Sequence, residues 1–302
     1  ADFTFSDEGT LLYRALHGKS ELEWVARGGR SLGSIAEPDH YGSVRLDPRG
    51  ERLAYTLENS ETGSVDLWVR ELARGISTRI TSHDRWLGTP RWSPDGTRLA
   101  FRADWKGPPN VYLVDLDVRE PVEIVPYDGS AHVVSDWTAD GAVMYGKRTA
   151  GSVHLWMVQV DDLEHRALVE SPFPHFDATV SRDGQWIAYS STDTGRAEIY
   201  VATFPSIRNR TRVSTDGGEE ARWNEDGTEI YYETPEGVFA VSFDAKGPTI
   251  GTPELVVPDW GDNMIEFDVA PDGQRFIVRR SDRADRFPPD RLITDWPRLL
   301  ER

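Results

Sequence analysis

The chain has 302 residues, no cysteine and a formal net charge of −17, from 34 Lys and Arg against 51 Asp and Glu. A surface this acidic repels phosphate backbones, so nucleic acid is a poor partner prediction, and the missing thiols exclude a disulfide framework. No run of 18 apolar residues is present and Ala1 starts no apolar leader, so we expect a mature or excised fragment with no direct membrane insertion.

One phrase recurs seven times along the chain: a strand-like run, a polar segment, Gly, and a second strand-like run. The copies are FTFSDEGTLLY, VRLDPRGERLAY, RWSPDGTRLAF, DWTADGAVMY, TVSRDGQWIAY, RWNEDGTEIYY and DVAPDGQRFIV. Their pivot glycines, which lie 41 to 46 residues apart, are Gly9, Gly50, Gly96, Gly141, Gly184, Gly227 and Gly273. A period in this range is typical of β-propeller blades.

Each copy predicts a β-hairpin, because Gly supplies the positive φ of a tight turn and the flanking residues alternate in polarity. A third strand is predicted in six copies, at residues 22–25, 67–69, 111–113, 155–158, 199–201 and 238–241. A fourth strand is predicted at residues 79–81, 123–125, 167–169, 212–214 and 255–257. Four short antiparallel strands make one propeller blade.

Seven copies predict a single all-β domain over residues 1–302, a β-propeller of seven four-stranded antiparallel blades, with six blades as the alternative. The last blade should be incomplete, because only residues 292–294 follow its hairpin as a candidate strand. No strand precedes the first copy at Phe3. We therefore expect the ring to close by face packing between the first and last blades.

Two adjacent positions of the first strand in each copy differ in character. Trp92, Trp137 and Trp223 occupy the place of an apolar residue in the other copies, which indicates packing between blades. The residue before this position is polar in every copy: Thr4, Arg45, Arg91, Asp136, Thr179, Arg222 and Asp268. Alternation along a strand turns these side chains to the opposite face, where Arg and Asp of neighbouring blades could pair.

Three histidines, His40, His132 and His175, precede a pivot glycine by nine or ten residues, where a loop enters the innermost strand. In a propeller such loops converge on one mouth of the central channel. Carboxylates occur in the same register, and imidazole with carboxylate suits a divalent metal such as Mn, Fe, Ni or Zn. A divalent metal is one hypothesis, and polar loops that hold no cofactor are the other.

Aromatic and acidic residues of these loops form a candidate ligand-binding surface. They are Tyr41, Trp86, Phe173, Phe176, Trp260, Glu220 and Glu266. The rings could stack on a sugar or on a partner side chain, or they could plug the hub. No catalytic residue is predicted, because the one G-x-S-x-G match, Gly29 to Gly33, falls in a turn between strands of one blade and not on a strand-to-helix elbow.

The phrases RWSPDGTRLAF, VSRDGQWIAYSSTDTGRAEIYV and DVAPDGQRFIV resemble the WD-like repeats of the TolB propeller. From its first copy to Ile293-Thr294-Asp295-Trp296, the chain is also similar to the C-terminal propeller regions of bacterial membrane-spanning serine/threonine kinases. This resemblance implies an extracytoplasmic or periplasmic sensor or protein-binding module. It supplies no catalytic residues, and a fold alone does not imply an activity.

Three functions are compatible with these observations. The first is a non-enzymatic WD40-like repeat module that binds a protein, a peptide or a cell-envelope glycan. The second is a metal-dependent polysaccharide lyase of the oligogalacturonate type, with the histidines at the channel mouth. The third is an accessory propeller that gates a peptidase domain. The sequence favours the first.

Overall fold

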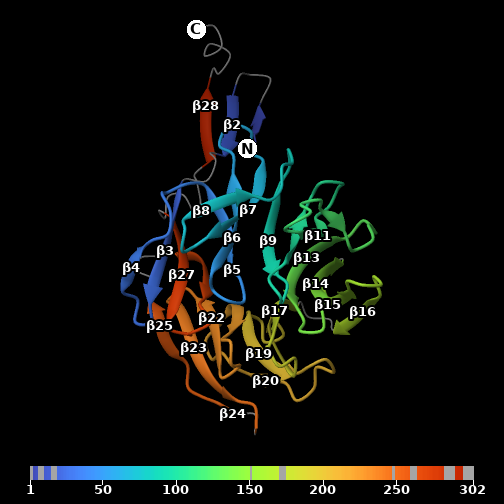
Figure 1. Cartoon of the computed structure of the whole chain (residues 1–302), viewed down its shortest axis with the longest axis vertical. Coiled ribbons are helices and arrows are strands. Elements are labelled where there is room, and N and C mark those ends of the chain that lie inside the picture. The colour runs from blue at the N-terminus through green and yellow to red at the C-terminus, as the bar shows by residue number, and fades with distance from the viewer. Residues whose placement is uncertain are drawn as a thin grey trace.

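The computed structural model describes residues 3–5, 10–14, 19–149, 152–169, 175–246, 249–258, 264–281 and 290–294. Six of the seven sheets that the described strands form are blades around a common axis (Figure 1). Within each blade neighbouring strands are antiparallel, and the first strand after each long connection lies innermost.

Blade 1 contains β5 (Tyr41–Leu46), β6 (Arg52–Glu58), β7 (Val65–Glu71) and β8 (Ile76–Arg79). Blade 2 contains β9 (Leu87–Trp92), β10 (Arg98–Ala103), β11 (Asn110–Asp115) and β12 (Val122–Glu123). Blade 3 contains β13 (Ala131–Trp137), β14 (Ala142–Thr149), β15 (Ser152–Gln159) and β16 (His165–Val169).

Blade 4 contains β17 (His175–Val180), β18 (Trp186–Ser191), β19 (Glu198–Thr203) and β20 (Thr211–Arg212). Blade 5 contains β21 (Glu219–Trp223), β22 (Glu229–Thr234) and β23 (Gly237–Asp244), which pairs with both β24 (Thr249–Ile250) and β25 (Glu254–Pro258). Blade 6 contains β26 (Met264–Val269), β27 (Arg275–Ser281), β3 (Ser20–Ala26) and β4 (Ser31–Ser34).

The prediction of seven blades is wrong, and so is the prediction of closure by face packing. Strand β3 from the start of the chain pairs with β27, with Ser20 opposite Ser281 and Ala26 opposite Arg275. Figure 1 shows these blue and red strands side by side. The ring therefore closes through a hydrogen-bonded sheet, in which residues predicted for a first blade complete the last one.

The first repeat copy does not form a blade of the ring. Its strands β1 (Phe3–Phe5) and β2 (Thr10–Arg14) pair with β28 (Asp290–Thr294) in a separate three-stranded sheet. In Figure 1 this sheet stands apart from the six blades. Residues 292–294, predicted as the third strand of an incomplete last blade, thus pair outside the ring, and the last blade of the ring has four strands.

The predicted glycine turns are confirmed for the six pivots that the structure describes. Gly50 and Gly96 have φ of 67° and 72°, and their N–H groups donate to the carbonyl oxygens of Asp47 and Ser93 at 2.8 and 2.9 Å. A residue with a Cβ is strained at such φ, which explains why each hairpin turns at Gly.

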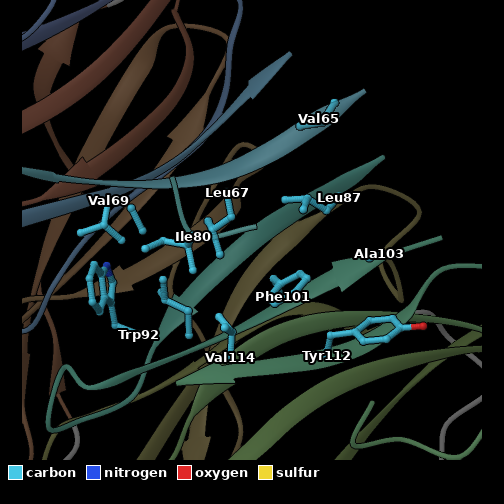
Figure 2. Close-up of a cluster of buried hydrophobic side chains, with 12 residues drawn as sticks. Val65, Leu67, Val69, Ile80, Leu87, Trp92, Phe101, Ala103, Tyr112 and Val114 are labelled. Atoms are coloured by element: carbon cyan, nitrogen blue, oxygen red, sulfur yellow. The ribbon is translucent and has the colours of Figure 1, made fainter. Parts of the chain in front are cut away.

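The hydrophobic core lies between adjacent blades. Figure 2 shows one such interface, where Leu67 of blade 1 packs with Phe101 and Trp92 of blade 2. Full burial of a Leu or Phe side chain contributes roughly 1.5–3 kcal/mol. The tryptophans of the repeat are therefore core residues between blades, as predicted.

Hydrogen bonds from these tryptophans also connect the blades. The indole N–H groups of Trp92, Trp137 and Trp223 each donate to a backbone carbonyl of the preceding blade, on Arg45, Arg91 and Thr179, at 3.0, 3.1 and 3.3 Å respectively. Among the described residues, no helix is long and apolar enough to cross a membrane.

Candidate functional site

The polar residues before the repeat aromatics surround the axis of the ring. Six of them line a cavity of about 180 Å³, which we call the neck: Arg45, Arg91, Asp136, Thr179, Arg222 and Asp268. Their place follows from strand alternation, because the next side chain turns into the space between blades. The polar position that recurs in the sequence is therefore the wall of the channel.

A larger cavity of about 360 Å³, which we call the mouth, adjoins the neck and shares Trp92, Asp136 and Arg222 with it. The turns that follow the innermost strands surround the mouth. Its apolar lining includes Pro48, Pro94, Pro271, Trp92, Trp137 and Trp223. The channel thus has a partly apolar mouth and a smaller, charged neck.

An ion network joins three blades at the neck. The guanidinium of Arg45 contacts carboxylate oxygens of Glu266 at 2.6 Å and Glu220 at 3.1 Å, and Arg222 also donates to Glu220. Burial raises the pKa of Glu220, but the guanidinium groups of Arg222, Arg45 and Arg91 lower it to about 2. Burial lowers the pKa of Arg45, but the carboxylates of Glu266 and Glu220 raise it above its ordinary value. Such buried ion networks fix the relative position of elements more than they add stability.

Arg91 differs from the other two neck arginines. Its Nε and Nη1 donate to the backbone carbonyl oxygens of Ser135 and Pro90, at 2.6 and 3.0 Å. Within the described part of the chain it forms no ion pair. Burial and the nearby guanidinium groups of Arg45 and Arg222 lower the pKa of Arg91 to about 9.

Three residues of the innermost strands have strained backbone conformations. Thr89, Asp177 and Glu220 have φ of 51°, 50° and 57°, and each lies where the pairing with the next strand shifts register. Such conformations cost of the order of 1–3 kcal/mol for residues other than Gly and persist where surrounding contacts impose them. Burial and the charge of Glu220 raise the pKa of Asp177 to about 7. The bulges thus carry carboxylates of two adjacent blades into the channel.

Two of the predicted ligand residues, Glu220 and Glu266, take part in the ion network. Tyr41 packs edge-on against Tyr55, with ring centroids 5.5 Å apart, and its hydroxyl donates to the carbonyl oxygen of Glu37. Trp86 stacks with the guanidinium of Arg102 at 4.5 Å. Phe173 and Trp260 lie outside the described residues, as does the side chain of Phe176.

The predicted metal ligands do not meet around one point in the described part of the chain. His132 is buried in blade 3, its ring 5.5 Å from that of Tyr145 and its Nε2 3.7 Å from Asp128. His40 precedes β5, and the side chain of His175 lies outside the described residues. No group of three or more His, Asp or Glu side chains among the described residues could hold a metal. The metal remains a prediction.

The predicted ligand surface lies where loops enter the innermost strands, whereas the mouth cavity lies at the opposite ends of these strands. Arg91 and the Pro and Trp residues that line the mouth are not among the predicted site residues. The signal for Arg91 was present, because the position before the repeat aromatic is polar in all seven copies.

Comparisons with known proteins agree with this architecture. Residues 28–175 match the model of the TolB beta propeller domain. The solved structure of a putative TolB from Agrobacterium tumefaciens superposes with a TM-score of 0.64 over 87% of this chain and 98% of that one, at 18% identity. At that identity the likeness shows the fold alone.

Two curated relatives match parts of the chain. Lipoprotein LpqB of Corynebacterium jeikeium is 30% identical over 180 residues, which cover 57% of this chain and 29% of the relative. The protein TolB homolog of Chlorobium luteolum is 27% identical over 143 residues, which cover 47% of this chain and 32% of the relative. The chain thus spans less than a third of either relative.

Proposed function

For this chain, a TolB-like β-propeller, we propose that it is a non-catalytic module that binds a segment of a partner protein at the mouth of its channel. The observation that carries the proposal is the mouth cavity of about 360 Å³, which prolines and tryptophans line next to a charged neck. Concave sites with an apolar lining and a few placed polar groups are typical of ligand binding.

The exposure of the aromatic rings favours a protein segment over a glycan. Sugar binding on tryptophan uses an open ring face, whereas Trp92 and Trp137 are only 7% and 5% exposed. The small exposed parts of these rings and the adjacent Pro48, Pro94 and Pro271 offer small apolar contacts of the kind that an extended peptide can fill.

The setting of the module is also a proposal. We place it outside the cytoplasm of a bacterium, because one similar protein is a lipoprotein and the repeats resemble extracytoplasmic propellers. A sensor role within a longer chain, such as a membrane-bound serine/threonine kinase, rests on the motif resemblance and on the short span of each relative that the chain matches. No specific contact favours the lyase or the peptidase gate.

Site-specific photo-crosslinking tests the binding role. Ala139 is exposed and lines the mouth, whereas Ala73 is an exposed alanine in the outer turn between β7 and β8. With Ala139→p-benzoylphenylalanine we expect a discrete crosslinked protein from an envelope extract of the source bacterium, and none with Ala73→p-benzoylphenylalanine. Crosslinks of equal yield from both positions, or from position 73 alone, would contradict the proposal.

A reverse experiment then blocks the site. Ala139→Arg places a long charged side chain in the mouth without removing a core contact, and Ala73→Arg is the matched control. We expect the first variant to lose most of its binding to the partner identified by crosslinking and the second to keep it. Both should unfold at the temperature of the wild-type protein.

A further inference from the structure

We propose that the neck of the channel binds a carboxylate group of the partner segment through Arg91. This inference deepens the proposed function, since it gives the chemistry of the group that reaches furthest into the channel. It rests on the position, the hydrogen bonds and the electrostatic surroundings of one side chain.

Arg91 is 7% exposed, and it lines the neck. Two of its three nitrogens donate to backbone carbonyls, on Ser135 and Pro90, which hold the guanidinium in place. Its Nη2 makes no hydrogen bond to any residue that the structure describes. A buried, positioned guanidinium therefore has one nitrogen available to a ligand in the neck.

The other charged groups of the neck are already engaged. Arg45 and Arg222 contact Glu220, and Arg45 also contacts Glu266. Asp136 occupies in blade 3 the repeat position that Arg91 occupies in blade 2. Both of its carboxylate oxygens accept hydrogen bonds, from the hydroxyl of Thr179 and from the backbone N–H groups of Val180 and Trp137. Arg91 is thus the neck arginine that the protein leaves without a carboxylate.

The surroundings make an anion favourable at Arg91 and limit its charge. Two further guanidinium groups, on Arg45 and Arg222, repel Arg91, so an incoming anion relieves this repulsion and forms a charge-assisted hydrogen bond. The carboxylates of Glu220, Glu266 and Asp268 lie in the same channel and repel a dianion more strongly than a monoanion. A carboxylate fits these conditions better than a phosphate.

The volume of the neck limits how much of the partner segment can enter it together with the carboxylate. The neck has about half the volume of the mouth, about 180 against 360 Å³. It accommodates a chain end or one acidic side chain, while the rest of the segment stays in the mouth. A chain end and an acidic side chain both present a carboxylate group. Small probes that carry one or the other kind of carboxylate distinguish between them.

The test uses small probes and the whole chain. N-acetyl-leucine carries a terminal carboxylate, N-acetyl-glutamate α-amide carries only a side-chain carboxylate, and N-acetyl-leucinamide carries none. Binding is followed by NMR, through the guanidinium Nε–H signal of Arg91 and the indole signals of Trp92 and Trp137. We expect at least one carboxylate probe to bind about tenfold or more tightly than the amide, as loss of a charge-assisted hydrogen bond implies.

Two variants assign the effect to Arg91. Arg91→Gln removes the charge and should abolish the preference for carboxylate over amide. Arg74→Gln makes the same change in net charge at an exposed arginine of blade 1 and should keep that preference. If Arg91→Gln does not fold, the movement of the Arg91 Nε–H signal in the wild-type protein decides the question.

Three results would overturn the proposal: equal binding of amide and carboxylate, a carboxylate preference that survives in Arg91→Gln, or tighter binding of inorganic phosphate than of either carboxylate probe. If only N-acetyl-leucine binds, the source is a chain terminus, and if only the glutamate probe binds, the source is an acidic side chain. No partner protein is needed, so a failure here is distinguishable from a failure of the crosslinking experiment.

Discussion

The carboxylate of Asp268 in blade 6 accepts a hydrogen bond of 2.7 Å from the backbone N–H of Leu46 in blade 1. Asp136 makes the equivalent bond to the N–H of Val180, at 3.0 Å. Leu46 and Val180 stand at the repeat position where other blades have tryptophan. In blades 1 and 4, an aspartate of the preceding blade thus makes the connection between blades that a tryptophan indole makes in blades 2, 3 and 5.

Loss of this bond should weaken the closed ring. In Asp268→Ala the buried N–H of Leu46 loses its acceptor and Arg222 loses a neighbouring negative charge, 3.8 Å away. We expect the free energy of unfolding to fall by about 2–4 kcal/mol in urea titrations. Asp117→Ala, at an exposed aspartate after β11, should change it by less than about 0.5 kcal/mol. Equal effects of the two substitutions would contradict the assigned role of Asp268.

Truncation tests the six-blade topology. Removal of residues 1–18 deletes no strand of the ring, whereas removal of residues 1–34 deletes β3 and β4 and leaves the hydrogen-bonding edge of β27 unpaired. We expect the shorter deletion to keep a cooperative thermal transition and the longer one to lose it and aggregate. A folded, monomeric protein without residues 1–34 would disprove closure by β3.

Two tryptophans separate the indole hydrogen bond from ring packing. Trp137 donates to the carbonyl oxygen of Arg91, whereas the buried Nε1 of Trp186 has no hydrogen-bond partner in the described part of the chain. Both substitutions to Phe shorten the ring system equally. We expect Trp137→Phe to cost about 1 kcal/mol more than Trp186→Phe in the free energy of unfolding. A larger loss of free energy of unfolding in Trp186→Phe than in Trp137→Phe would show that ring packing, and not the indole hydrogen bond, determines the cost of the substitution.

Asp177 predicts a pH dependence of stability. Its folded pKa, about 7, lies above the ordinary value of 3.8, so its contribution is most favourable below pH 4 and is lost as the pH rises through 7. Asp177→Asn keeps the size of the side chain and suits the positive φ. The variant should therefore melt at a higher temperature than wild type at pH 8, by a margin that shrinks towards pH 4. A margin that does not change with pH would show that Asp177 titrates normally.

The metal hypothesis has a direct test in thermal unfolding. Because His132 is 1% exposed and packs against Tyr145, we expect added Mn²⁺ or a chelator to leave the melting temperature unchanged. A ligand bound only to the folded protein would raise it. A rise with Mn²⁺ that disappears in His132→Ala would instead support a metal at this histidine.

Much of the blade was predictable because its determinants are local. Gly50 and Gly96 set their turns through φ values that other residues avoid, and Trp92 and Trp137 lie between blades because of a period of two along the strand. The same alternation predicted that the residues before them share a face. These features need no knowledge of distant parts of the chain.

The sequence by itself determined a β-propeller of repeated four-stranded blades, with glycine turns and tryptophan cores. Only the tertiary structure decided that the blades number six, that Ser20–Ala26 completes the sheet of Arg275–Ser281, and that Arg91 remains without a carboxylate in the neck. The physical reason is that a strand carries the pattern of its own two faces but not the identity of its neighbour, and that ion pairs across the axis depend on which blades the closed ring brings together.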